Sequence, residues 1–158
     1  MIVVQISGGI GNQLFQYCYA LHLKNLNPNK KVCIENSFYQ CQPSLLDQRR
    51  YELGDFENLG IELVNVDFIN KMRSIKSKII KKIWYLFMIV FKPSKAYFII
   101  SNNSGIINAA ISKLFKNNYL TGDWQNKDFD YKFYLNAVSN LKLRPEKEAE
   151  LINQNLLG

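Results

Sequence analysis

The feature that most constrains the fold is a cluster of glycines between a strand-like run and a helical pattern. Residues 1–7, MIVVQIS, form an uninterrupted strand-like run that is rich in β-branched side chains, as expected for a strand buried on both faces. Gly8, Gly9 and Gly11 interrupt this run, and from residue 12 to 26 apolar residues recur at helical spacing. A strand, a glycine turn and a helix in this order predict the start of an α/β sheet.

Strand-like and helical segments continue to alternate along the chain. KKVCIE, residues 30–35, predicts a second strand and completes a βαβ unit that we expect to be parallel and right-handed. Further strands are expected at 61–65, 96–101 and 118–122, helices at 67–91 and 145–157, and a short element at 49–56. The alternation predicts the α/β class with a Rossmann-like parallel sheet.

The net charge of +7 comes from one segment of the chain. Residues 71–95 contain eight basic residues and no acidic one, which leaves 12 basic and 13 acidic residues elsewhere. A helix here would have one apolar stripe and one basic side, which is either solvated or in peripheral contact with an anionic membrane. Its nine uncharged residues, 83–91, are too few to span a bilayer. No RNA-binding aromatic motif accompanies the basic segment, so no nucleic-acid partner is expected.

Cysteine and histidine are scarce, which limits metal and disulfide chemistry. The three cysteines, Cys18, Cys33 and Cys41, form no C-x-x-C pair, and His22 is the single histidine. Neither a zinc knuckle nor a disulfide framework is suggested, and no metal cofactor is expected. We expect Cys18 to be buried, His22 to pack or face solvent, and the protein to occupy a reducing, cytoplasmic setting.

The glycine turn offers several possible chemistries. Its backbone N–H groups and the amides of Asn12 and Gln13 would suit a sugar, a phosphate or both. Alternatively, the glycines only make a tight connection, with Asn12 capping the helix. A third interpretation is a dinucleotide fold with Glu35 as the ribose-binding acid, although Leu14 occupies the third glycine position of that fingerprint.

Three stretches of the chain resemble glycosyltransferase family 11, the bacterial α-1,2-fucosyltransferases. GGIGNQLFQYCYA (8–20) is similar to the family's N-terminal GG-(L/I/M)-GNQ-(L/M)-FQY signature. RRYELGDF (49–56) resembles its R-x-Y-x-L-x-x-F segment, and YLTGDWQNKDF (119–129) resembles Y-L-x-G-Y-W-Q-S-x-x-Y/F. Asp123 and Asn126 depart from the usual Tyr and the frequent Ser. The family's H-x-R-R-x-D-Y motif does not occur in these 158 residues.

This resemblance implies the N-terminal, acceptor-side portion of a GT-B type enzyme. Such enzymes transfer fucose from GDP-fucose to a galactose 2-hydroxyl with inversion and without an obligatory metal. Residues 1–143 would form the Rossmann-like domain, and 144–158 would begin a helix leading to a missing donor-binding domain, so this portion alone would be nearly inactive. The implied partners are GDP-fucose and a galactoside or lipid-linked glycan, in the cytoplasm or at the inner face of the cell membrane through residues 71–95.

The resemblance also suggests substrate-binding residues, although it names no catalytic base. The candidates are Gly8, Gly9, Gly11, Asn12, Gln13, Gln16, Trp124 and Gln125. Gln16 either faces the cleft or lies on the helix surface, and Trp124 either stacks on a sugar or anchors the core. Asp123 and Asp128 are available carboxylates, but solvated surface positions are favoured for both. A non-catalytic module that binds a nucleotide or carbohydrate remains the alternative function.

Overall fold

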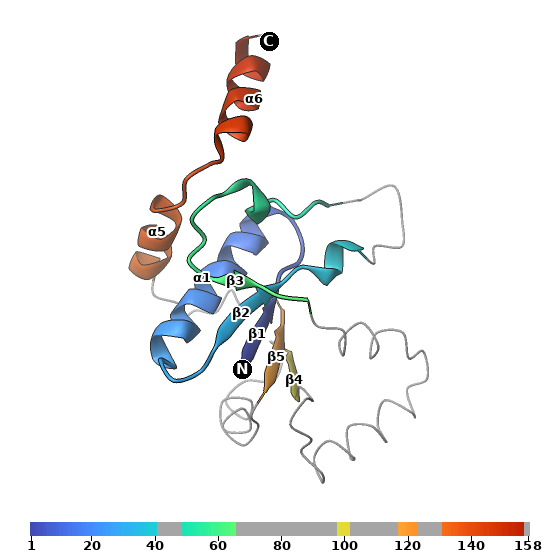
Figure 1. Cartoon of the computed structure of the whole chain (residues 1–158), viewed down its shortest axis with the longest axis vertical. Helices are drawn as coiled ribbons and strands as arrows, with labels where there is room; N and C mark the ends of the chain where they lie inside the picture. Colours follow the sequence, from blue (N-terminus) through green and yellow to red (C-terminus); the bar gives the residue numbers. More distant parts are fainter. Residues whose placement is uncertain (41–48, 66–97, 102–116, 123–130, 157–158) are drawn as a thin grey trace.

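A five-stranded parallel sheet forms the centre of the protein (Figure 1). The computed structural model describes residues 1–40, 49–65, 98–101, 117–122 and 131–156. The strands are β1 (Ile2–Gln5), β2 (Val32–Glu35), β3 (Glu62–Leu63), β4 (Phe98–Ser101) and β5 (Asn118–Thr121), in the spatial order β3-β2-β1-β5-β4. The helices are α1 (Ile10–Leu26), α5 (Tyr131–Ser139) and α6 (Pro145–Leu156), with short 3₁₀ turns at Ser37–Gln40 (η1) and Leu53–Asp55 (η2).

The two central strands are buried on both faces, as their composition predicts. Val3 and Val4, which point to opposite faces of β1, are both 0% exposed. β1 pairs in parallel with β2, with Ile2 opposite Val32 and Val4 opposite Ile34. The predicted α/β class and the parallel pairing of the first two strands are therefore confirmed.

Helix α1 covers one face of this sheet. The cluster that joins them contains alternate residues of β1 (Ile2, Val4, Ile6) and Tyr17, Cys18 and Ala20 of the helix. The helix begins at Ile10, two residues before the apolar pattern indicates, and its N-cap is Gly9, with no side-chain capping bond. The interpretation of Asn12 as the cap is wrong, because that residue already lies in the first helical turn.

The later elements agree with the sequence in position more than in length. The strands expected at 61–65 and 118–122 are present but shorter, and the strand expected at 96–101 is present over its described residues, 98–101. Helix α6 begins at Pro145 as predicted. The helix expected at 67–91 lies outside the described residues.

Helix α5 was not predicted from the sequence. It packs on α1, where the rings of Phe15 and Tyr134 stack at 4.7 Å between centroids. Helix α6 points away from the sheet (Figure 1), and its Leu151 and Ile152 are exposed. No helix in the described part of the chain is long and apolar enough to cross a membrane.

The order of the strands identifies where a ligand would bind. The chain proceeds from β1 outward to β2 and β3 on one side, whereas β4 and β5 lie on the other side, with β5 next to β1. The direction of winding therefore reverses between β1 and β5. In open parallel sheets ligands bind at such a switch point, beyond the carboxyl ends of the strands. The glycine turn follows β1 at this place, and Gly122 follows β5.

Candidate functional site

The three glycines of the turn have different roles. Gly8 has φ +77°, and a Cβ atom there would lie 2.8 Å from Asn12 Nδ2, so both conformation and space require glycine. A Cβ atom at Gly9 would lie 2.8 Å from an Arg49 guanidinium nitrogen. Gly11 is exposed, and a Cβ atom there would meet nothing within 4 Å. The chain therefore passes closest to other groups at Gly8 and Gly9.

Gln13 braces the turn from inside the protein. Its side chain is 0% exposed, and Nε2 donates to the carbonyls of Gly8 at 3.1 Å and Arg50 at 2.9 Å. Its Oε1 accepts from the backbone N–H groups of Glu52 at 2.8 Å and Leu53 at 3.1 Å. These four bonds use both donor hydrogens and both lone pairs of the amide. Gln13 therefore holds the turn against residues 50–53 and offers nothing further to a ligand.

Gln16 connects the two sides of the switch point. It is also 0% exposed, and its Oε1 accepts from the N–H of Ser7 at 2.7 Å. Its Nε2 donates to Ser7 Oγ at 3.1 Å and to the carbonyl of Gly122 at 3.0 Å. Neither of the two expected positions, facing the cleft or on the helix surface, is found, because the amide is enclosed between the ends of β1 and β5.

Asn12 is the amide of the motif that stays partly exposed. It is half-buried in the first turn of α1, with its side chain packed beside Gly8. Of the three amides predicted to bind a substrate, Asn12 is therefore the one placed to reach a ligand above the turn, while Gln13 and Gln16 support it.

Two tyrosines support the turn from the side of β2. The Tyr39 hydroxyl donates to the carbonyl of Gly8 at 2.9 Å, and the rings of Tyr39 and Tyr51 lie 5.9 Å apart. Burial raises the pKa of Tyr51 to about 12 and, together with the nearby Glu52, raises that of Tyr39, so both hydroxyls are protonated at neutral pH. Sequence reasoning missed Tyr39, although its place shortly after a predicted strand could have indicated it.

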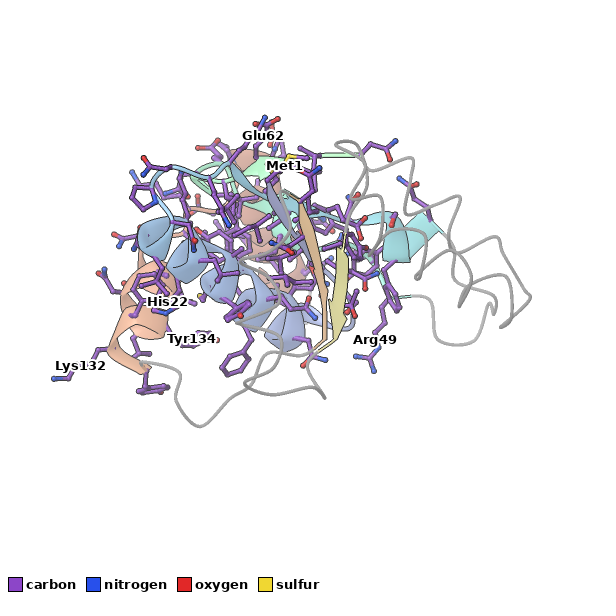
Figure 2. All side chains as sticks on the ribbon, turned by 90° about the horizontal axis from the view of Figure 1, so that it is seen from below. Met1, His22, Arg49, Glu62, Lys132 and Tyr134 are labelled. Atoms are coloured by element: carbon purple, nitrogen blue, oxygen red, sulfur yellow. The ribbon has the colours of Figure 1, made fainter. Side chains whose placement is uncertain are left out.

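The mouth of the turn is electropositive. Helix α1 has no acidic residue in its first turn, and its N-terminal N–H groups present the positive end of the helix dipole. The exposed Arg49 adds a guanidinium beside Gly9, and Figure 2 shows it at the end of the sheet where β4 and β5 terminate, opposite Met1 and Glu62. Such a site favours an anionic or strongly polar group.

Glu35 does not fit the role of a ribose-binding acid. It is 1% exposed at the end of β2. One carboxyl oxygen accepts from the N–H of Ser37 at 2.7 Å, and the other accepts from the Tyr119 hydroxyl. Both oxygens bond to groups within the protein. The dinucleotide interpretation therefore lacks a free ribose-binding acid as well as the third glycine of its fingerprint.

Other predicted residues fall in several places. Trp124, Gln125, Asp123 and Asp128 lie outside the described residues, directly after Gly122 in the chain. His22 packs edge-on against Phe133, with ring centroids 5.6 Å apart, as the packing alternative predicts. Cys18 is buried as expected, and so is Cys33. Over the described ranges, no group of three or more His, Cys, Asp or Glu residues is placed to hold a metal ion.

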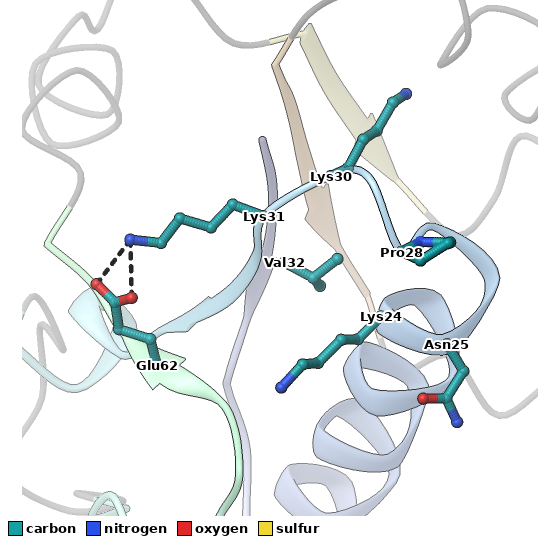
Figure 3. Close-up of a pocket in the computed structure, with 7 residues that line it drawn as sticks. All are labelled: Lys24, Asn25, Pro28, Lys30, Lys31, Val32 and Glu62. Carbon is teal, nitrogen blue, oxygen red and sulfur yellow. Dashed lines mark hydrogen bonds and ion pairs between the residues drawn. The ribbon is translucent and has the colours of Figure 1, made fainter.

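A separate hollow lies at the opposite, amino-terminal edge of the sheet (Figure 3). It is lined by Lys24, Asn25, Pro28, Lys30, Lys31, Val32 and Glu62. Lys31 is paired with Glu62 at 2.7 Å, and the Lys24 ammonium donates to the carbonyl of Gly60 at 2.8 Å. Because these two charges already have partners and the hollow is remote from the glycine turn, it does not belong to the candidate site.

The fold and the site define an α/β protein with a braced, electropositive glycine turn at the switch point of its sheet. Comparisons of the chain with protein-family models, curated proteins and solved structures found no match.

Proposed function

We propose that the chain is the N-terminal, acceptor-side portion of an inverting, GDP-fucose-dependent fucosyltransferase of the family 11 type. The observation that carries the proposal is that the three stretches resembling that family meet in space. Gln13 of the first stretch bonds to Arg50, Glu52 and Leu53 of the second. Gln16 of the first stretch bonds to Gly122 of the third.

The contacts among the three stretches support the proposal, because each stretch was matched to the family by its sequence alone. They lie far apart in the chain, and Gln16 and Gly122 are separated by 106 positions. The connecting groups are fully buried amides that satisfy backbone atoms, so replacing either one would leave buried polar groups unpaired. The three stretches meet at the switch point of the sheet, which is where open parallel sheets bind their ligands.

The chemistry of the turn suits a nucleotide sugar. In the proposed reaction the galactose 2-oxygen attacks C1 of fucose, GDP leaves with the electron pair of the C1–O bond, and the proton of the 2-hydroxyl passes to a base or to water. Arg49 and the start of α1 favour the negative charge that develops on the leaving group. Asn12 supplies an amide to the sugar. In a GT-B arrangement the H-x-R-R-x-D-Y motif of the other domain would bind the diphosphate.

The second part of the proposal concerns the acceptor. A galactoside, free or linked to a lipid, fits the resemblance, and the basic segment 71–95 would bring the protein to an anionic membrane surface. That segment lies outside the described residues, so binding to vesicles with and without anionic lipid tests it separately.

Transfer of fucose from labelled GDP-fucose to lactose tests the function. The chain itself should transfer little, whereas a form that also carries an H-x-R-R-x-D-Y domain should be active. Absence of transfer, together with absence of GDP-fucose binding by that longer form, would overturn the proposal. Binding of a nucleotide or sugar without transfer by either form would instead favour the non-catalytic module.

A further inference from the structure

Gln5 is a buried polar residue without a hydrogen-bond partner for its side chain. It is the last residue of β1 and is only 8% exposed. Among the residues that the structure describes, none donates to or accepts from its amide. Buried polar groups are nearly always paired, so an unpaired amide at the carboxyl end of the central strand requires an explanation.

The amide of Gln5 remains open to a small group. Some polar side-chain atoms in the described part of the chain are fully enclosed and lack a partner, the Tyr51 hydroxyl among them. Neither polar atom of Gln5 is fully enclosed in this way, so the small exposed fraction of this residue includes its amide. A group that enters from the carboxyl edge of the sheet can therefore form the bonds that the protein does not.

The neighbours of Gln5 determine which ligand groups can fit beside it. Gln5 is in register with Glu35, so both side chains point to the sheet face opposite α1. The Tyr119 hydroxyl reaches Glu35 from β5, on the other side of β1. Glu35 accepts hydrogen bonds on both carboxyl oxygens, so it presents acceptor atoms and no donor beside Gln5. Phosphate oxygens, which also act as acceptors, are disfavoured here, whereas a hydroxyl, which can donate, is not.

We propose that Gln5 binds a sugar hydroxyl, in a subsite for an uncharged group at the carboxyl end of β1, three residues before Gly8 of the electropositive glycine turn. A hydroxyl both donates and accepts, and so does an amide, so one sugar hydroxyl can satisfy both polar atoms of Gln5. The inference rests on the proposed function for the identity of the sugar, which is either the galactose of the acceptor or the fucose of the donor. The unpaired amide is retained at a cost in stability because it contacts the ligand.

The test replaces the amide with an apolar group of similar size. In the full chain, Gln5→Met should keep or raise the thermal midpoint, because an unpaired buried amide is removed. Binding of lactose to this chain, or of GDP-fucose to the form that also carries an H-x-R-R-x-D-Y domain, is measured by titration and should weaken about 5- to 10-fold for the sugar that Gln5 contacts. Gln13→Met is the matched control, because the same change at a fully bonded amide should lower the midpoint.

The outcomes separate this inference from the proposed function. Unchanged affinity for both lactose and GDP-fucose in a folded Gln5→Met protein, repeated with Gln5→Leu, would overturn the sugar contact while leaving fucosyl transfer intact. Weaker lactose binding alone assigns the contact to galactose, and weaker GDP-fucose binding alone assigns it to fucose. If neither sugar transfer nor GDP-fucose binding exists, a Gln5-dependent affinity for lactose would still support the subsite.

Discussion

The side-chain amide of Gln16 donates a hydrogen bond of 3.0 Å to the carbonyl of Gly122 and thereby joins helix α1 to the end of β5, 106 positions later in the chain. The same amide accepts from the N–H of Ser7, so one residue of α1 connects the ends of β1 and β5. These two strands flank the switch point of the sheet. Besides the pairing of β1 with β5, this one buried side chain therefore connects Gly122 to the glycine turn.

Replacement of this amide should destabilise the protein. Gln16→Met leaves the partly buried N–H of Ser7 and carbonyl of Gly122 without their partner, and we expect a loss of about 2 kcal/mol in the free energy of unfolding. Urea unfolding followed by circular dichroism measures this loss. The control is Gln154→Met on exposed α6, which should change stability little. Equal effects of both substitutions would contradict the bracing role.

The glycines of the turn should respond to alanine in opposite directions. Gly8→Ala forces an alanine into φ +77° and against Asn12, which should cost at least about 1–2 kcal/mol. Gly11→Ala adds a methyl group in open space within α1, which should stabilise the helix by about 0.5–1 kcal/mol. Thermal unfolding of the two variants compares them. A destabilised Gly11→Ala protein would show that the described conformation of the first helical turn is wrong.

The hydroxyl groups of Tyr17 and Tyr51 provide a matched comparison of a bonded and an unbonded group. The Tyr17 hydroxyl donates to the carbonyl of Leu59 at 2.8 Å, whereas the buried Tyr51 hydroxyl has no partner. We expect Tyr17→Phe to lower stability by about 1 kcal/mol, and Tyr51→Phe to be neutral or stabilising. Denaturant midpoints test both. If Tyr51→Phe proved the more damaging change, its hydroxyl would have a hydrogen bond that the structure lacks.

Alkaline pH should weaken the fold in part through Cys18. Burial raises the pKa of the Cys18 thiol from 9.0 to about 12, so the folded state keeps a proton that the unfolded chain releases above pH 9. This contribution to stability is complete below pH 9 and is lost between about pH 9 and 12. Unfolding free energies measured from pH 8 to 11 should fall less steeply for Cys18→Ala than for the unchanged protein. Parallel pH profiles would exclude the thiol as a cause.

Asn12 should matter for the ligand more than for the fold. It does not cap α1, and it lies half-buried beside Gly8 at the mouth of the turn. In the form that carries the H-x-R-R-x-D-Y domain, Asn12→Ala should reduce fucosyl transfer at least about tenfold, which corresponds to one hydrogen bond to a reacting sugar. Its thermal midpoint should stay nearly unchanged. Parallel losses of activity and midpoint would make Asn12 a structural residue instead.

Local patterns in the sequence were sufficient for the main elements of the fold. A β-branched run that ends in glycines predicted β1 and the turn, and Pro145 followed by acidic residues predicted the start of α6. These elements could be predicted because their signals lie within a few neighbouring residues. Helix α5 could not be predicted, because its nine residues depend on ring contacts such as that between Phe15 and Tyr134.

The roles of the amides were decided by the tertiary structure. The sequence by itself indicated Asn12 and Gln13 as ligand contacts at the glycine turn and left Gln16, one helical turn later, either facing the cleft or on the helix surface. Burial distinguishes them, because the partners of Gln13 and Gln16 come from distant segments. A periodic pattern in the sequence does not indicate which backbone groups remain unpaired in the folded chain. An amide becomes a brace or a ligand contact according to what surrounds it, and that is determined only when the strands assemble.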